Sequence, residues 1–285
     1  MVVIVQNSKL AKGLLLLIIP IAPLANAIFN SPSQAATLGN SEATVKINDF
    51  SHDPADVLIL AETYSNAVAS NGSVVAEANN ALIVGNEPFF AKNASFSETN
   101  GDGSEYSGLA QSTAAIVGYN FLIDKGETFS FNFKAALNLE TSIDNPQFES
   151  ATATGNISFK LYESSNPNNW IYLDSFTLSG NLATMSSNDS LNYEISNSFT
   201  LNPSKTALET SFGEQQETAK ASTQGIFSRT FNVLSNLTLV EAKTNQAEVN
   251  ANRGSVSVPE SSNILGLLLC VTGMGYRITR KAFRR

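Results

Sequence analysis

The chain has 285 residues, of which 15% are charged, and it carries a net charge of −8 at pH 7. Seven of its 17 lysines and arginines lie near the two termini, so the body from Thr37 to Val258 keeps ten cations against 24 carboxylates, a net charge of −14. Because nucleic acid and anionic lipid headgroups bind cationic surfaces, this acidic body excludes nucleic acid as a partner.

The first 27 residues have the features of a Sec signal peptide. Two lysines precede the apolar run 14–19, and Ala25 and Ala27 supply the small-x-small pattern that signal peptidase recognises. The residues just before position 36 are also small, so cleavage as late as residue 36 is an alternative. We therefore expect export through the Sec translocon, with an uncleaved N-terminal anchor as the alternative.

Residues 37–250 are predicted to form an all-β domain, because apolar and polar residues alternate with a period of two. In the segment 127–139 one face carries only apolar side chains: Phe129, Phe131, Phe133, Ala135, Leu137 and Leu139. The same alternation occurs in four further segments: Asn156 to Tyr162, Ser190 to Ile195 (Leu191, Tyr193 and Ile195 on one face), Phe227 to Phe231, and Leu237 to Glu241. About ten such strands predict an antiparallel β-sandwich of two packed sheets with jelly-roll-like connections.

The segment 53–84 is ambiguous, since its alanines and serines fit a helix or strands, and strands are favoured. Asn71-Gly72 predicts a hairpin that joins 63–70 to 73–84. Further turn signals follow at Asp124 to Gly126, Ser164 to Asn169, Ser186 to Asp189 and Asn202 to Ser204. Residues 251–258 are polar and predict a linker.

Catalytic residues are scarce in the body. His52 is the only histidine and Cys270 the only cysteine, which excludes multi-histidine zinc sites and Cys-His sites. A Ser-His-Asp triad would have to use His52, which is instead expected in a surface turn. The sequence therefore predicts no catalytic residue and no enzyme, although paired carboxylates for glycoside cleavage stay open.

Two weak binding sites are predicted. Asn100, Asp102, Ser104 and Glu105 offer oxygen donors on a glycine-rich turn, which is a possible calcium site against the simpler interpretation of a solvated turn. No other cofactor is expected. Asp49, Asp53 and Asp56 form a second acidic loop. Trp170 and Tyr172 follow a polar loop, where an aromatic ring can stack on a sugar, although most aromatic residues on strands are buried.

The last 27 residues form the most specific pattern of the chain. Val258, Pro259 and Glu260 precede an apolar run from 264 to 276, and a basic tail follows: Arg277, Arg280, Lys281, Arg284 and Arg285. As a helix of about 1.5 Å rise per residue, the run reaches about 20 Å, which is short for a bilayer core of about 30 Å. It predicts a single short transmembrane helix with the cationic end on the cytoplasmic side.

This region resembles the PEP-CTERM sorting signal, which combines a Pro-Glu-Pro tripeptide, a short transmembrane helix and an arginine-rich tail. Pro259 and Glu260 match the tripeptide, whereas Ser261 stands where a second proline is usual. The resemblance covers residues 259–285 only. It implies processing by an exosortase-like protease in the inner membrane and release towards the cell exterior, often alongside exopolysaccharide.

Together these features predict an exported, non-enzymatic protein of the cell surface or extracellular matrix. The inner membrane would anchor it transiently, and exopolysaccharide is its expected partner in a structural or adhesive role. A carbohydrate-binding module is the first alternative and a secreted polysaccharide hydrolase the second.

Overall fold

The computed structural model describes residues 3–5, 37–86, 89–166 and 168–252. In these ranges the chain forms twelve strands, one 3-10 turn and no α-helix, which confirms the all-β prediction. The elements are β1 (Val3–Val5), β2 (Thr37–Asn48), β3 (Asp56–Asn86), β4 (Phe89–Ile123), β5 (Thr128–Ser142), β6 (Glu149–Glu163), β7 (Ile171–Ala183), β8 (Ser190–Ile195), β9 (Phe199–Leu201), η2 (Pro203–Lys205), β10 (Ala207–Ser211), β11 (Gln216–Thr230) and β12 (Ser235–Asn252).

Several predicted features lie outside the described residues. They are the signal-peptide cleavage residues Ala25 and Ala27, the sorting motif Val258, Pro259 and Glu260, the helix 264–276 with Cys270, and the tail cations Arg277, Arg280, Lys281, Arg284 and Arg285. Within the part of the chain that is described, no helix has the length and apolar character needed to cross a membrane.

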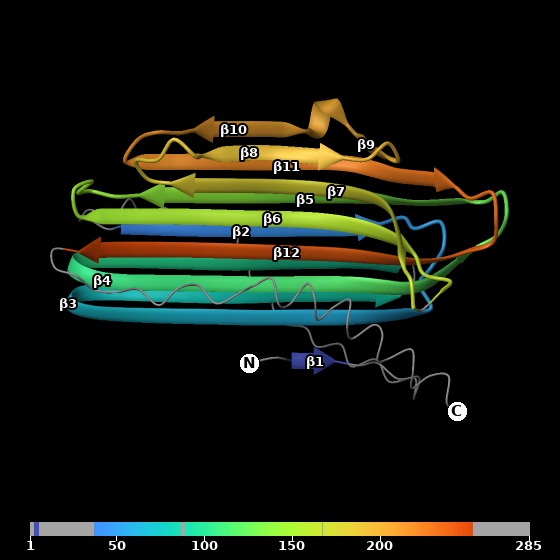
Figure 1. The fold of residues 1–285 in the computed structure, drawn as a ribbon, viewed down its shortest axis with the longest axis horizontal. Helices are drawn as coiled ribbons and strands as arrows, with labels where there is room; N and C mark the ends of the chain where they lie inside the picture. Colours follow the sequence, from blue (N-terminus) through green and yellow to red (C-terminus); the bar gives the residue numbers. More distant parts are fainter. Residues whose placement is uncertain (1–2, 6–36, 87–88, 167, 253–285) are drawn as a thin grey trace.

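All strands pair antiparallel in one continuous sheet, in the order β10-β11-β5-β2-β4-β12-β6-β7-β8. β3 pairs along β4, β1 pairs with β3, and β9 pairs with β11. The strands run along the long axis of the molecule (Figure 1). The sequence predicted two separate sheets, whereas the described strands form a single sheet.

The sheet folds over on itself because β3 and β4 curve round together at one end of the molecule (Figure 1). Residues 91–101 of β4 pair with β2, whereas residues 105–123 of the same strand pair with β12. We call the place where both strands turn, at residues 69–73 and 101–105, the bend end. The first layer contains β10, β11, β5, β2 and the first half of β4, and the second contains the rest of β4, β12, β6, β7 and β8.

Two glycines allow this bend. Gly72 and Gly103 are paired across the strands and have φ of 144° and 118°, a region that favours glycine. A Cβ on Gly72 would lie 2.2 Å from the carbonyl oxygen of Asp102. The hairpin predicted at Asn71-Gly72 is therefore wrong in its pairing. The chain does turn there, but the segments on either side pair with β4 instead of with each other.

Phenylalanine rings fill the space between the layers. Phe133 on β5 lies 5.0 Å from Phe176 on β7 and 5.3 Å from Phe159 on β6, measured between ring centroids, and all three are fully buried. Rings at such separations stabilise a core beyond the area they bury. The inward face predicted for 129–139 is buried throughout, as are Ile157, Phe159 and Leu161.

The last strand of the second layer departs from the predicted burial. Tyr193 and Ile195 on β8 are 41% and 42% exposed. Because β8 is the edge strand of the sheet, the opposite layer covers these positions only in part. Only Leu191 of that set packs against the core.

Candidate functional site

The loops opposite the bend form the loop end of the molecule. They connect β2 to β3 (49–55), β4 to β5 (124–127), β6 to β7 (164–170) and β11 to β12 (231–234). Both Thr37, where β2 begins, and Asn252, where β12 ends, lie at the bend end instead, since Thr37 pairs with Gly101 and Asn252 with Glu105. Strands of about 15 residues separate the two ends by about 50 Å.

A row of four aromatic rings lies at the loop end. Trp170 is half-buried, and its ring centroid lies 6.3 Å from Tyr119 of β4 and 5.8 Å from Tyr162 of β6. Tyr162 in turn lies 6.0 Å from Tyr172 of β7, in an edge-to-face arrangement. Tyr172 is 54% exposed, and its hydroxyl donates to the Ser175 hydroxyl at 2.5 Å. The two residues predicted to stack on sugars are thus joined through Tyr162.

Tyr119, at the inner end of this row, has a buried hydroxyl group. The Tyr119 hydroxyl oxygen is buried and has no hydrogen-bond partner within the described protein. Burial raises the pKa of Tyr119 to about 12. Binding sites for small molecules are lined mostly by apolar and aromatic side chains with a few polar groups, and the row supplies the aromatic part.

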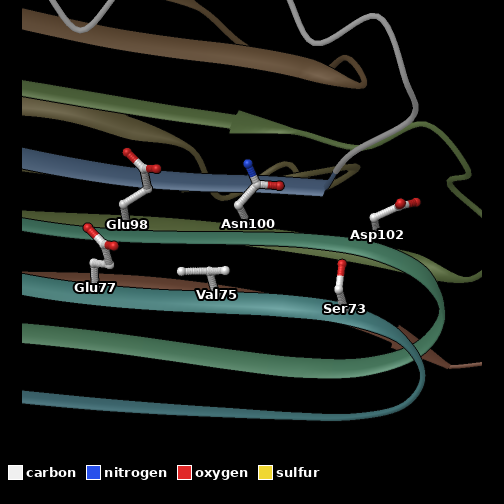
Figure 2. Close-up of a pocket in the computed structure, with 6 residues that line it drawn as sticks. All are labelled: Ser73, Val75, Glu77, Glu98, Asn100 and Asp102. Carbon is white, nitrogen blue, oxygen red and sulfur yellow. The ribbon is translucent and has the colours of Figure 1, made fainter.

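A shallow groove of about 310 Å³ crosses the outer face of β3 and β4 near the bend end (Figure 2). Its lining residues are Ser73, Val75 and Glu77 on β3 and Glu98, Asn100 and Asp102 on β4. Glu77 and Glu98 are directly paired across the strands. Burial raises the pKa of Glu98, and the neighbouring carboxylates of Glu77 and Glu140 raise it further.

The four residues of the predicted calcium site are divided between this groove and the bend. Asn100 and Asp102 line the groove. Ser104 instead accepts a hydrogen bond from the Asn71 side chain at 2.6 Å, and Glu105 accepts one from the Ser70 hydroxyl at 2.7 Å. Among the residues described, no three Asp, Glu, His or Cys side chains are grouped to hold a metal ion.

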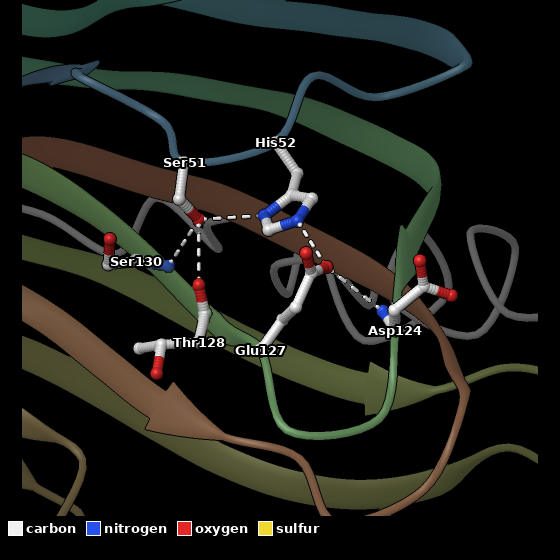
Figure 3. Close-up of polar contacts among 6 residues, drawn as sticks. All are labelled: Ser51, His52, Asp124, Glu127, Thr128 and Ser130. Carbon is white, nitrogen blue, oxygen red and sulfur yellow. Dashed lines mark hydrogen bonds and ion pairs between the residues drawn. The ribbon is translucent and has the colours of Figure 1, made fainter.

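His52 lies in the loop between β2 and β3, and its two ring nitrogens contact the side chains of Ser51 and Glu127 (Figure 3). Its Nδ1 is 2.9 Å from the Ser51 hydroxyl and its Nε2 is 3.1 Å from a Glu127 carboxylate oxygen. The hydrogen bond to His52, together with one from the Asp124 amide, holds the pKa of Glu127 below its usual range.

The order Ser51, His52, Glu127 resembles that of a hydrolytic triad, but the serine has other partners. Its hydroxyl donates to the Thr128 carbonyl at 3.1 Å and accepts from the Ser130 amide at 2.9 Å. A serine has one hydroxyl proton, so donation to Thr128 leaves none for His52 to accept. The arrangement is suited to holding the 49–55 loop against β5.

A buried polar cluster between the layers was not predicted. Lys243 and Glu241 on β12 have 0% and 1% exposed side chains, and the Lys243 ammonium donates to Glu241 Oε1 at 3.0 Å. The Asn93 amide nitrogen, from the first half of β4, donates to Glu241 Oε2 at 2.7 Å. Burial lowers the pKa of Lys243 from 10.5 to about 8, although the Glu241 carboxylate opposes this.

The cluster continues one step along β12. The Asn245 side chain donates to the carbonyl oxygen and the hydroxyl of Ser95, at 2.8 and 2.6 Å, and accepts from the Ser41 hydroxyl at 3.1 Å. Extending the alternation of 237–241 along the strand would place Glu241, Lys243 and Asn245 on the face of Leu237 and Leu239, which is the signal that could have located them. The sequence did not indicate their partners.

Comparisons with protein-family models, curated proteins and solved structures found no match.

Proposed function

We propose that the chain is an exported, non-enzymatic component of the cell surface or extracellular polysaccharide matrix, with a structural or adhesive role. In this proposal an exosortase-like protease processes the segment around Pro259 and Glu260. The two layers of the folded sheet act as a β-sandwich with jelly-roll-like connections, between an N-terminal signal peptide and a short C-terminal transmembrane helix.

The position of Asn252 is the observation that best supports this role. The proposed sorting segment follows Asn252 closely, and Asn252 lies at the bend end. A tether there directs the loop end, with its aromatic row, about 50 Å away from the attachment point. An elongated body of long paired strands (Figure 1), attached at one end and carrying the exposed Tyr172 ring at the other, suits an adhesive spacer.

Fractionation of cells with and without the sorting protease tests the proposal. In wild-type cells the protein should reach the surface or the medium, and mass spectrometry should find a C-terminus before Arg285. Cells that lack the protease, and a Pro259→Ala/Glu260→Ala variant, should keep the protein in the inner membrane. An intact Arg285 and an unchanged location in all three cases would overturn the proposal.

Site-directed labelling tests export separately. In a Cys270→Ser background, Asn168→Cys places a single thiol at an exposed position of the loop end, and Ser187→Cys provides the matched position at the bend end. A membrane-impermeant maleimide should label both in intact cells. Labelling that occurs only after lysis would contradict export.

The aromatic row favours a carbohydrate-binding module as the second candidate. Trp170 is the only tryptophan, so its fluorescence reports directly on a ligand at the row. A glycan that binds at micromolar concentration, shifts this fluorescence, and loses binding in Tyr172→Ala would support the candidate. The control is Tyr193→Ala, which removes another exposed tyrosine ring, on β8, and should not change binding.

A further inference from the structure

The buried cluster of Asn93, Glu241 and Lys243 contains the three groups that an intramolecular amide bond requires: an amine, a carboxamide and a carboxyl group between them. One carboxylate holds both nitrogens through its two oxygens, at 3.0 Å from Lys243 Nζ and 2.7 Å from Asn93 Nδ2. We propose that Lys243 and Asn93 form an isopeptide bond, with Glu241 as the proton-transfer group.

The surroundings favour the reaction because they exclude water. Asn93 and Lys243 are 0% exposed and Glu241 is 1% exposed. The cross-strand neighbours of Glu241 are Ile116 and Phe159, both buried. A shielded amine loses its hydration, which favours the neutral, nucleophilic form. The lowered pKa of Lys243 is consistent with this effect.

The Asn93 carboxamide is the group that the Lys243 amine would attack. Its carbonyl oxygen Oδ1 is buried and has no hydrogen-bond partner among the described residues. A buried carbonyl oxygen without a hydrogen-bond partner lowers the stability of the unlinked protein. Glu241 Oε2 accepts from Asn93 Nδ2 at 2.7 Å, so a carboxyl protonated at this oxygen is placed to protonate the departing nitrogen.

The steps balance without any further reactant. The Lys243 ammonium first transfers a proton to the Glu241 carboxylate, which leaves a neutral amine and a neutral carboxyl. The amine attacks Asn93 Cγ, the Nζ–Cγ bond forms, and the Glu241 carboxyl relays a proton from Nζ to Nδ2. The Cγ–Nδ2 bond then breaks and one ammonia molecule leaves. No atom is oxidised or reduced.

The product removes an electrostatic cost. Before the reaction a carboxylate and an ammonium are both buried, and the desolvation of such a pair can exceed its attraction. Afterwards a neutral amide and a neutral carboxyl occupy the same space. The new bond joins β4 to β12 across the two layers, in a body whose sequence has no cysteine for a disulfide.

Mass spectrometry of the purified full-length protein tests the proposal. The wild-type chain should be lighter than its sequence by one ammonia molecule, and proteolysis should release one branched peptide that contains both Asn93 and Lys243. Lys243→Met and Asn93→Ala should each lack the branched peptide and show the full mass. Because succinimide formation also releases ammonia, the branched peptide is the decisive reading.

Glu241→Gln tests the role of the carboxyl group. The glutamine side chain has nearly the same volume as glutamate, but its amide cannot accept and return a proton as a carboxyl group does. This variant should remain unlinked while its circular dichroism matches that of the wild type. Glu217→Gln changes another buried glutamate, which binds Thr141, and should remain linked. A full-mass wild-type chain without the branched peptide would overturn the isopeptide bond, and a linked Glu241→Gln variant would overturn the assigned role of Glu241.

Discussion

The ion pair between Arg229 of β11 and Asp174 of β7 joins the two layers near the loop end, and a double-mutant cycle can measure it. Arg229 Nη1 lies 2.6 Å from Asp174 Oδ2, and the other carboxylate oxygen accepts from the Ser196 hydroxyl at 2.7 Å. The Asp174 side chain is 5% exposed and that of Arg229 35%. Removal of the arginine therefore leaves a buried carboxylate with one remaining partner.

The expected magnitude follows from this geometry. Unit charges about 4 Å apart attract by about 4 kcal/mol at an effective dielectric constant of about 20. Solvent reaches the guanidinium, so screening should reduce the net coupling to about 1–2 kcal/mol. Arg229→Met should lower the free energy of unfolding by about 2–3 kcal/mol, because the uncompensated Asp174 charge adds to the lost contact.

Urea denaturation at pH 7 of the wild type, Arg229→Met, Asp174→Asn and the double variant provides the four free energies. The double variant should lose about 1–2 kcal/mol less than the sum of the two single losses. If the losses add to within about 0.5 kcal/mol, the two side chains are not coupled and the proposed cross-layer contact is incorrect.

Three further predictions follow from the core, the loop end and the bend. Phe159→Ala should lower the free energy of unfolding by about 3–5 kcal/mol in urea, because the ring is fully buried, whereas Phe212→Ala, at a 39% exposed position, should cost less than about 1 kcal/mol. The hydrogen bond with His52 lowers the pKa of Glu127, so its stabilising contribution is present above the usual pKa of 4.5 and is lost as the pH falls through the lowered value. Below pH 4.5 the melting temperature of the wild type should therefore converge with that of Glu127→Gln. Gly103→Ala should cost more than about 2 kcal/mol, because φ is 118° and the added Cβ would meet the facing strand at 2.5 Å, and an unchanged melting temperature would contradict this.

The strands could be predicted wherever one face is buried and the other is not. In β5 every inward residue from Phe129 to Leu139 is apolar, and most of the outward residues are polar. A period of two therefore predicts both the strand and its buried face. The same rule misjudged β8, because alternation indicates which residues share a face but not whether another layer covers that face. Tyr193 and Ile195 are exposed for this reason.

The bend shows why a local turn signal does not identify the partner strand. Asn71-Gly72 predicts a hairpin and Asn100 to Glu105 predict a glycine-rich turn, whereas in the structure these two segments are paired parts of one bend. A local sequence can specify that the chain turns, since glycine permits positive φ, but it does not specify the partner strand. Pairing over about 30 residues of β4 is a non-local property that one segment cannot reveal.

The polar cluster has a consequence for how the sheet keeps its register. Because side chains alternate along a strand, a shift of β12 by one residue would turn Glu241, Lys243 and Asn245 to the outer face and bring their neighbours Val240, Ala242 and Thr244 inward. The apolar or small neighbours would tolerate that change, so apolar burial alone discriminates weakly at this point of the strand. The hydrogen bonds to Asn93, Ser95 and Ser41 exist in only one register. A shifted cluster would leave the Asn93 amide and the Ser95 hydroxyl buried without these partners, whereas Ser41 would keep its bond to the Thr154 carbonyl oxygen. We infer that the cluster fixes the alignment of the two layers, and that an isopeptide bond within it would make this alignment permanent.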